Sequence, residues 1–202
     1  MDMPKAIIFD VGGVLISDLF ERYDQIAADR IGVSLDDFRK MRKKHWGDCR
    51  LGKIHSAEFW RRILSEFSKE DMLKDVVKGA YKVMKINRHI LVIVKKLAKS
   101  GRYKLGVVSN NSFEWSHYAK SVIGLGKYFS VWISSSDVGM KKPDKEIFLL
   151  ASDRLGVSPK DCIFIDNSKT NVAGAVAAGL TGIHYTTPSR LLKELRDLGI
   201  VV

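Results

Sequence analysis

Five short apolar runs alternate along most of the chain with longer stretches that have helical periodicity. The runs are rich in β-branched residues and cover residues 5–10, 103–109, 131–134, 162–166 and 182–185. The helical pattern covers residues 88–100, 113–123, 144–155, 169–178 and 189–198. Short β-branched runs are typical of buried strands. Strands that alternate with helices predict an α/β fold in which a parallel sheet is covered by helices on both faces.

The region between the first run and the helix predicted at residue 88 has a different pattern. It is rich in helix formers and has no convincing strand. Ser34-Leu-Asp-Asp37 and Ser68-Lys-Glu-Asp71 have the form of capping boxes at the start of helices. We expect three or four helices, inserted between two short hinges near Ile16 and Asn87. The pattern thus predicts a core domain, residues 1–16 and 87–202, and an inserted helical domain, residues 17–86.

The composition predicts a protein that folds without disulfide bonds in a reducing compartment. Its 202 residues, 46% of them hydrophobic, can bury a large core. Two cysteines, Cys49 and Cys162, lie far apart and lack the spacing of a metal site. The start of the chain does not have the pattern of a leader, and no apolar run approaches the ~18 residues of a membrane span. We therefore expect a cytoplasmic protein with no membrane contact.

Basic residues exceed acidic residues by 34 − 23 = 11, so the chain favours encounters with anions. The densest basic cluster, residues 39–44, falls on a predicted helix without the interleaved aromatic residues that stack on nucleic-acid bases. We expect this cluster to be a solvated face. The predicted partner is a small phosphorylated metabolite and not a nucleic acid. The pattern predicts no particular oligomeric state.

Polar residues follow three of the predicted strands at the point where each strand ends. They are Asp10, Ser109, Asn110, Asp166 and Asn167. In an open parallel sheet the carboxyl ends of the strands meet at one edge, where ligands bind. Lys142 precedes a predicted helix and would bring an ammonium to the same crevice. Two carboxylates, a hydroxyl and an ammonium predict a site for a phosphate and a divalent cation.

Four segments resemble, in order, the four motifs of the haloacid dehalogenase (HAD) superfamily. They are Phe9-Asp10-Val11-Gly12-Gly13-Val14, Val108-Ser109-Asn110, Lys142-Pro143-Asp144-Lys145-Glu146-Ile147-Phe148 and Phe164-Ile165-Asp166-Asn167-Ser168. The helical insertion after the first motif is similar to that of the branch with phosphoglycolate phosphatases and epoxide hydrolase amino-terminal domains. The resemblance covers residues 1–16 and 87–188. It implies a doubly wound, Rossmann-like core and an inserted helical cap that closes over the site.

The resemblance also implies a magnesium-dependent phosphatase. Asp10 would be the catalytic nucleophile and form an aspartyl-phosphate, which divides one difficult hydrolysis into two easier steps. Ser109, together with Asn110, would bind the phosphoryl oxygens. Lys142 would contact the substrate and neutralise charge on the nucleophile and the phosphoryl group. The implied Mg²⁺ ligands are Asp10, the backbone carbonyl of Gly12, Asp166 and Asn167.

Two positions depart from the pattern of active relatives. Gly12 stands where phosphatases of this superfamily usually carry the aspartate that protonates the leaving group, and loss of such an acid typically costs ~10²–10⁴-fold in rate. We therefore expect activated phosphate esters to react best, unless His45 or His55 of the cap replaces the acid. Asn167 stands where many relatives have a second acidic metal ligand, which predicts weaker Mg²⁺ binding. Two alternatives stay open: a catalytically reduced binding or regulatory protein, and a 2-haloacid dehalogenase.

Overall fold

The computed structural model describes residues 4–202 and contains a parallel sheet with the strand order β3-β2-β1-β4-β5. The strands are β1 (Ala6–Phe9), β2 (Lys104–Ser109), β3 (Val131–Ser134), β4 (Cys162–Asp166) and β5 (Thr181–His184). β1 lies in the centre and pairs in parallel with β2 and β4. Each strand coincides with one of the predicted apolar runs, apart from small shifts at the ends. The predicted α/β fold with a Rossmann-like parallel sheet is confirmed.

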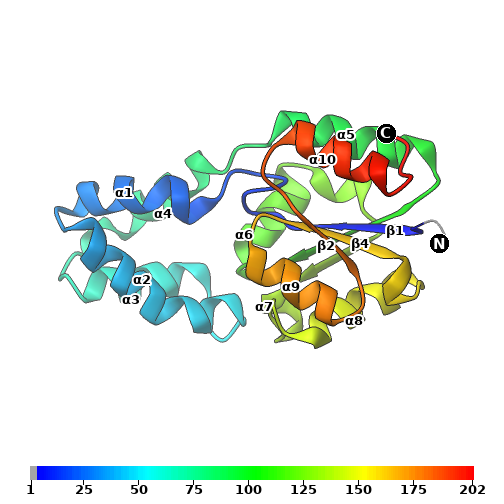
Figure 1. The fold of residues 1–202 in the computed structure, drawn as a ribbon. Helices are drawn as coiled ribbons and strands as arrows, with labels where there is room; N and C mark the ends of the chain where they lie inside the picture. Colours follow the sequence, from blue (N-terminus) through cyan, green and yellow to red (C-terminus); the bar gives the residue numbers. More distant parts are fainter. Residues whose placement is uncertain (1–3) are drawn as a thin grey trace.

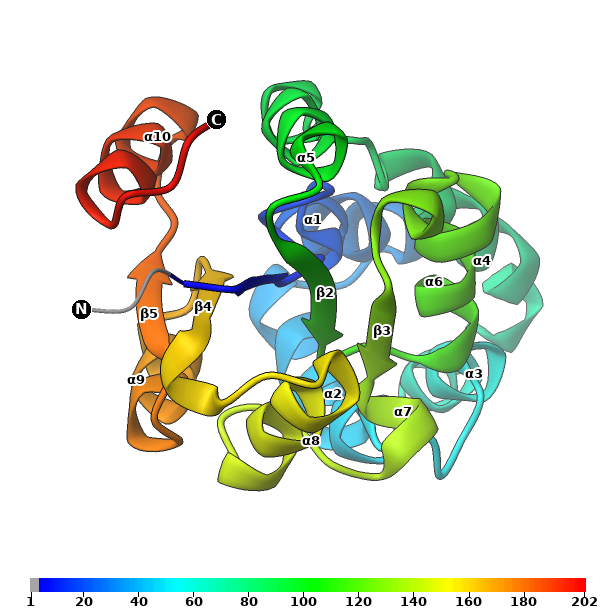
Figure 2. The ribbon, with the colours of Figure 1, turned by 90° about the vertical axis from the view of Figure 1, so that its right-hand side faces the viewer.

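Helices cover both faces of the sheet, as Figures 1 and 2 show. One face carries α5 (Arg88–Ser100) and α10 (Pro188–Asp197), and the other carries α8 (Lys145–Leu155) and α9 (Lys169–Ala177). In the described part of the chain, no helix is both long and apolar enough to cross a bilayer.

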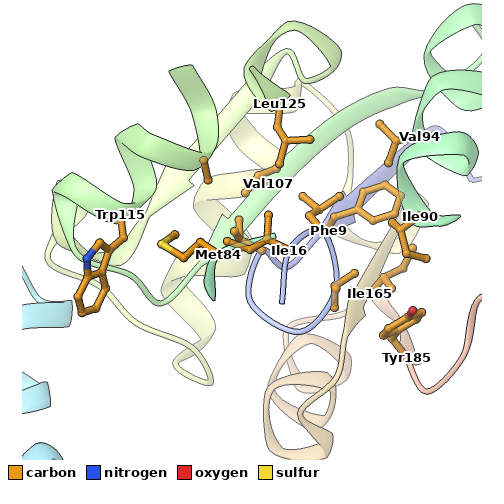
Figure 3. Close-up of a cluster of buried hydrophobic side chains, with 14 of the residues drawn as sticks. Phe9, Ile16, Met84, Ile90, Val94, Val107, Trp115, Leu125, Ile165 and Tyr185 are labelled. Atoms are coloured by element: carbon orange, nitrogen blue, oxygen red, sulfur yellow. The ribbon is translucent and has the colours of Figure 1, made fainter. Parts of the chain in front are cut away.

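The central strand separates two apolar cores. Ile7 and Phe9 belong to the core on the α5 side, which includes Ile90 and Val94 (Figure 3). Ile8, between them, belongs to the core on the side of α8 and α9. Successive side chains of a strand point to opposite faces, so a strand covered on both faces must be apolar at every position. This explains why β1 reads as an unbroken apolar run up to the point where it reaches Asp10.

Shorter elements connect the strands and helices of the sheet. They are α6 (Phe113–His117), the π-helical η2 (Tyr118–Val122), the 3-10 helices η3 (Leu125–Tyr128) and η4 (Pro159–Asp161), and α7 (Ser135–Val138). The continuous helix expected over residues 113–123 is therefore a short α-helix that widens into a π turn. The N–H of Ile123 closes this turn by donating to the carbonyl of Tyr118 at 2.8 Å.

Four α-helices lie beyond the carboxyl ends of the strands, at the left of Figure 1. They are α1 (Leu19–Ile31), α2 (Leu35–Arg50), α3 (Ser56–Ser65) and α4 (Leu73–Val83), with the 3-10 helix η1 (Glu70–Met72) before α4. We call residues 19–83 the helical layer. The Ser34 hydroxyl accepts from the backbone N–H of Asp37 at 3.1 Å, as the predicted capping box requires.

The capping box expected at Ser68 is wrong. Ser68 has a φ of 54°, and the N–H of the next residue, Lys69, donates to the carbonyl of Leu64 at 3.0 Å. A left-handed residue with such a bond ends a helix, here α3. Helix α4 begins only at Leu73, five residues after Ser68, and has no side-chain cap. Serine and acidic residues are common both at helix starts and in the turns that end helices. The pattern of residues 68–71 therefore could not distinguish the start of α4 from the end of α3.

The two segments that join the helical layer to the sheet are hydrogen-bonded to each other. Ile16 and Ile86 form an antiparallel bridge. The N–H of Ser17 donates to the carbonyl of Lys85 at 2.8 Å, and the N–H of Asn87 donates to the carbonyl of Leu15 at 2.9 Å. We call these two segments, residues 15–17 and 85–87, the double connection.

Candidate active site

A cavity of about 230 Å³ opens between the carboxyl ends of the central strands and the helical layer. Residues from β1, β2 and β4 form its floor, because parallel strands end at the same edge of a sheet. Its lining includes every residue to which the resemblance assigns a catalytic, binding or metal-ligating role: Asp10, Gly12, Ser109, Asn110, Lys142, Asp166 and Asn167. The structure thus brings all of the predicted site residues together.

A buried lysine joins two buried carboxylates on the cavity floor. Lys142 Nζ donates to Asp10 Oδ1 at 2.5 Å and to Asp166 Oδ2 at 2.7 Å. Burial raises the pKa of Asp10 to about 7; Lys142 works against this rise, and Asp166 adds to it. Burial alone would lower the pKa of Lys142, but attraction to the two carboxylates raises it above its ordinary value. One buried ammonium therefore pairs with two buried carboxylates, and the floor keeps an excess of negative charge.

Further hydrogen bonds fix the positions of two of these groups, Asp166 and Lys142. Asp166 Oδ1 accepts from the N–H of Ser168 at 2.7 Å, and Asp166 Oδ2 also accepts from Asn171 Nδ2 at 3.0 Å. The Asn110 amide bonds to both backbone groups of Lys142, accepting from its N–H at 2.8 Å and donating to its carbonyl at 2.9 Å. Asn110 therefore holds the loop that carries the lysine. Contact between Asn110 and a substrate stays a prediction.

The two glycines after Asp10 have different reasons to be glycine. Gly13 has a φ of 80°, and a Cβ there would collide with the side-chain amide of Asn167. A larger residue at position 13 would be strained and would displace Asn167. Gly12 does not have a positive φ, and the nearest atom to a Cβ built there, Asp18 Oδ2, lies 3.6 Å away. A side chain at position 12 is therefore compatible with the backbone.

Three aromatic side chains of the cavity lining form what we call the aromatic wall. Phe20 and Trp46 come from the helical layer, and Trp115 comes from α6. The Trp115 ring stacks on that of Trp46 with centroids 5.9 Å apart, and its edge contact with Phe20 has centroids 6.0 Å apart. The cavity therefore has a charged end beside Asp10 and an apolar end beside these rings, an arrangement typical of small-molecule sites.

Sequence reasoning missed the fourth charged residue of the cavity, Asp18. It is the N-cap of α1, where its Oδ1 accepts from the N–H of Glu21 at 2.9 Å. The sequence does contain a signal: Asp18 and Glu21 have the spacing of a helix start. That signal predicts the cap but not the cavity, because it says nothing about where the other carboxylate oxygen lies.

The chain is similar over most of its length to known hydrolases. The family model of haloacid dehalogenase-like hydrolases matches residues 4–179. The chain is 28% identical over 201 residues to flavin mononucleotide hydrolase 1 of Arabidopsis thaliana, covering 97% of this chain and 78% of that protein. It is 26% identical over 195 residues to (S)-2-haloacid dehalogenase 4A of Burkholderia cepacia, covering 91% and 83%.

Solved structures show the same fold. An HAD family enzyme of Bacteroides thetaiotaomicron matches with a TM-score of 0.75 and 24% identity, over 92% of this chain and 95% of that one. A variant of that enzyme, solved in complex with magnesium and inorganic phosphate, matches with a TM-score of 0.72 and 25% identity, over 91% and 94%.

Proposed function

Since this chain belongs to the haloacid dehalogenase-like hydrolases, we propose that it is a magnesium-dependent phosphatase of small phosphorylated metabolites. The observation that carries the proposal is the charge of the cavity, which three carboxylates and one ammonium line: Asp10, Asp18, Asp166 and Lys142. An anionic substrate is repelled by such a site unless a further cation is bound. This favours a metal-dependent phosphatase over a dehalogenase that works without metal.

Asp10 is the proposed nucleophile. Its carboxylate ends the most central strand, and its Oδ1 is held by Lys142. Attack of a carboxylate oxygen on phosphorus would form an aspartyl-phosphate and expel the alcohol. Lys142 would stabilise the charge that builds up on the transferring group, and the Ser109 hydroxyl would bind a phosphoryl oxygen. Asn110 would keep Lys142 in place through the two backbone hydrogen bonds described above.

The oxygen donors around Asp10 fit Mg²⁺. Within residues 4–202 there is no cluster of three or more acidic, histidine or cysteine side chains suited to a metal. The proposed ligands are therefore two carboxylates, Asp10 and Asp166, with the Gly12 carbonyl and the Asn167 amide oxygen. Hard oxygen donors of this kind suit magnesium, and the excess negative charge of the floor supplies the attraction. When bound, the cation would polarise a phosphoryl oxygen and offset its negative charge.

The size of the cavity favours a small substrate. Pockets for drug-sized ligands have volumes of ~300–1,000 Å³, whereas this cavity measures about 230 Å³. The volume therefore favours a compact substrate over a flavin nucleotide, the substrate named for the Arabidopsis relative. The aromatic wall of Phe20, Trp46 and Trp115 favours a substrate whose leaving group has an apolar part. We further propose that residues 17–86 act as a cap over a core of residues 1–16 and 87–202.

A phosphate-release screen tests the proposal. The wild-type protein is incubated with sugar phosphates, acyl phosphates, nucleotides and an aryl phosphate, with Mg²⁺ or with EDTA. Metal-dependent release of phosphate is expected, together with its loss in Asp10→Asn, which keeps the size of the side chain. Asp137→Asn, the same change at an exposed carboxylate of α7, is the matched control and should keep full activity.

Other results would contradict the proposal. Phosphate release that survives in Asp10→Asn would exclude Asp10 as the nucleophile. No turnover of any ester, with retained binding of phosphate compounds, would indicate a binding protein. Release of halide from a 2-haloacid without metal would indicate a dehalogenase.

A further inference from the structure

We propose that Asp18 is the proton donor and acceptor that replaces the side chain missing at Gly12. This inference rests on the phosphatase function proposed above. A phosphatase without a proton donor would react well with activated esters but poorly with alkyl esters. The structure offers a carboxylate that comes from another element and reaches the same place.

The position of Asp18 is the first part of the argument. A Cβ built on Gly12 would have Asp18 Oδ2 as its nearest neighbour, at 3.6 Å. Asp18 lines the same cavity as the nucleophile Asp10. Its carboxylate therefore lies beside the volume that an aspartate side chain at position 12 would fill.

The way Asp18 is held is the second part. One of its oxygens, Oδ1, accepts from the N–H of Glu21 and caps α1. This bond fixes the orientation of the carboxyl group, and Oδ2 is the oxygen on the Gly12 side. Asp18 is half-buried, so a water molecule can reach it. A positioned oxygen that can gain and lose a proton is what general acid–base catalysis requires.

Elimination of the other candidates is the third part. The ionisable side chains that line the cavity are Asp10, Asp18, Lys142 and Asp166. Three of these four form the buried ion-pair network of the floor. The cap histidines considered from the sequence are not part of the lining: His45 pairs with Glu66 at 3.0 Å, and His55 pairs with Glu114 at 2.8 Å. Asp18 is the remaining group.

The proposed steps balance in atoms and charge. In the first step, an oxygen of Asp10 bonds to phosphorus while the bond between phosphorus and the ester oxygen breaks. Protonated Asp18 gives its proton to that ester oxygen, and the alcohol leaves. In the second step, Asp18 takes a proton from water as the water oxygen attacks phosphorus of the aspartyl-phosphate. The bond between phosphorus and Asp10 then breaks, which releases phosphate and restores both residues.

The test compares the dependence of rate on the leaving group in a set of variants. kcat/KM is measured with Mg²⁺ for a series of aryl phosphates and one alkyl phosphate. Asp18→Asn removes the proton but keeps a good N-cap for α1. Glu21→Gln removes a neighbouring exposed carboxylate of α1 and is the matched control. Gly12→Asp in the Asp18→Asn background places a carboxylate at position 12, where the backbone conformation allows it. Thermal unfolding of each variant checks that the fold is intact, and Asp18→Ser, which also keeps a cap, is used if Asp18→Asn does not fold.

We expect Asp18→Asn to lower kcat/KM for the alkyl phosphate by ~10²–10⁴-fold and for the most activated aryl phosphate by far less. The rate of this variant would then fall steeply as the leaving-group pKa rises, whereas the wild-type rate would not. Glu21→Gln should match the wild type, and the Gly12→Asp double variant should recover much of the alkyl-ester rate.

Four results would overturn the inference. The first is an alkyl-ester rate in Asp18→Asn close to that of the wild type. The second is an equal loss on every ester, which indicates a structural role. The third is a wild-type protein that already shows the steep dependence. The fourth is a wild-type protein that, like Asp10→Asn, releases no phosphate from any ester; in that case the proposed function itself fails.

Discussion

Replacing Lys142 with methionine removes the ammonium from the cavity floor but keeps an unbranched side chain of similar length. The Lys142 side chain is 1% exposed, and those of its partners Asp10 and Asp166 are 9% and 1% exposed. The variant would leave two buried carboxylates without their cation. Asp166 keeps its bonds to Ser168 and Asn171, so most of the unbalanced charge falls on Asp10.

The size of the effect follows from the loss of one partner of a buried ion pair, which typically costs about 3–5 kcal/mol. We expect the free energy of unfolding of Lys142→Met to fall by about this amount at pH 8. Burial already raises the pKa of Asp10 to about 7, and loss of Lys142, which lowers it, raises it further. A carboxyl whose folded-state pKa is raised destabilises the protein as pH rises toward that pKa. The loss relative to the wild type should therefore be larger at pH 8 than at pH 5, and the increase should fall above the wild-type pKa of about 7.

Urea unfolding followed by tryptophan fluorescence measures this difference at both pH values, without Mg²⁺. Lys141→Met is the matched control, because Lys141 pairs at 2.8 Å with Asp144 and the two side chains are 31% and 44% exposed. Exposed pairs contribute about 0–1 kcal/mol, so this variant should change little. Lys142→Met should also lower the free energy of unfolding by less in an Asp10→Asn background, because the charge that Lys142 offsets at Asp10 is then absent. If Lys142→Met lowers the free energy of unfolding at pH 8 by no more than Lys141→Met does, the reasoning is refuted.

Two further predictions concern a pair of helix glycines and the two buried thiols. Gly47→Ala in α2, where a Cβ meets open space, should raise the free energy of unfolding by about 0.5–1 kcal/mol. Gly79→Ala in α4 should lower the free energy of unfolding by about 1–3 kcal/mol, because the Cβ would collide with the Tyr23 ring. Thermal unfolding measures both variants, and a change of the same sign in the two would contradict the packing. Burial raises the pKa of the Cys49 thiol to about 12 and of the Cys162 thiol to about 11. Ellman's reagent at pH 8 should therefore label neither thiol in the native protein and both in concentrated urea, and prompt native labelling would show that these cores open.

The sheet could be predicted because the strands are buried on both faces. A run such as Ala6–Phe9 has no polar position, and its length suits a strand and not a helix. Once the strands are in place, the parallel topology puts Asp10, Ser109 and Asp166 at one edge. The composition of the cavity floor therefore follows from local patterns together with one general property of parallel sheets.

The contacts that the helical layer makes could not be predicted in this way. They depend on how the helical layer packs, and that packing joins positions with no fixed spacing. Asp24 shows the difficulty: the basic cluster read as a solvated face contributes Arg42, whose Nε lies 2.9 Å from the buried Asp24 Oδ1. Asp18 is a second case, because a helix cap and a cavity carboxylate have the same sequence signature.

The double connection should allow the helical layer to be exchanged for another segment without a change in the sheet. Because Ile16 bridges Ile86, the chain leaves the sheet and returns to it at nearly the same point. The hydrogen bonds of the double connection hold the two ends of the inserted segment together. The strands on either side therefore need not change when that segment changes in length or shape. Evolution could exchange the inserted helices while the buried ion-pair network stayed intact. The same property offers a route for engineering, in which a different helical segment is grafted between residues 17 and 85.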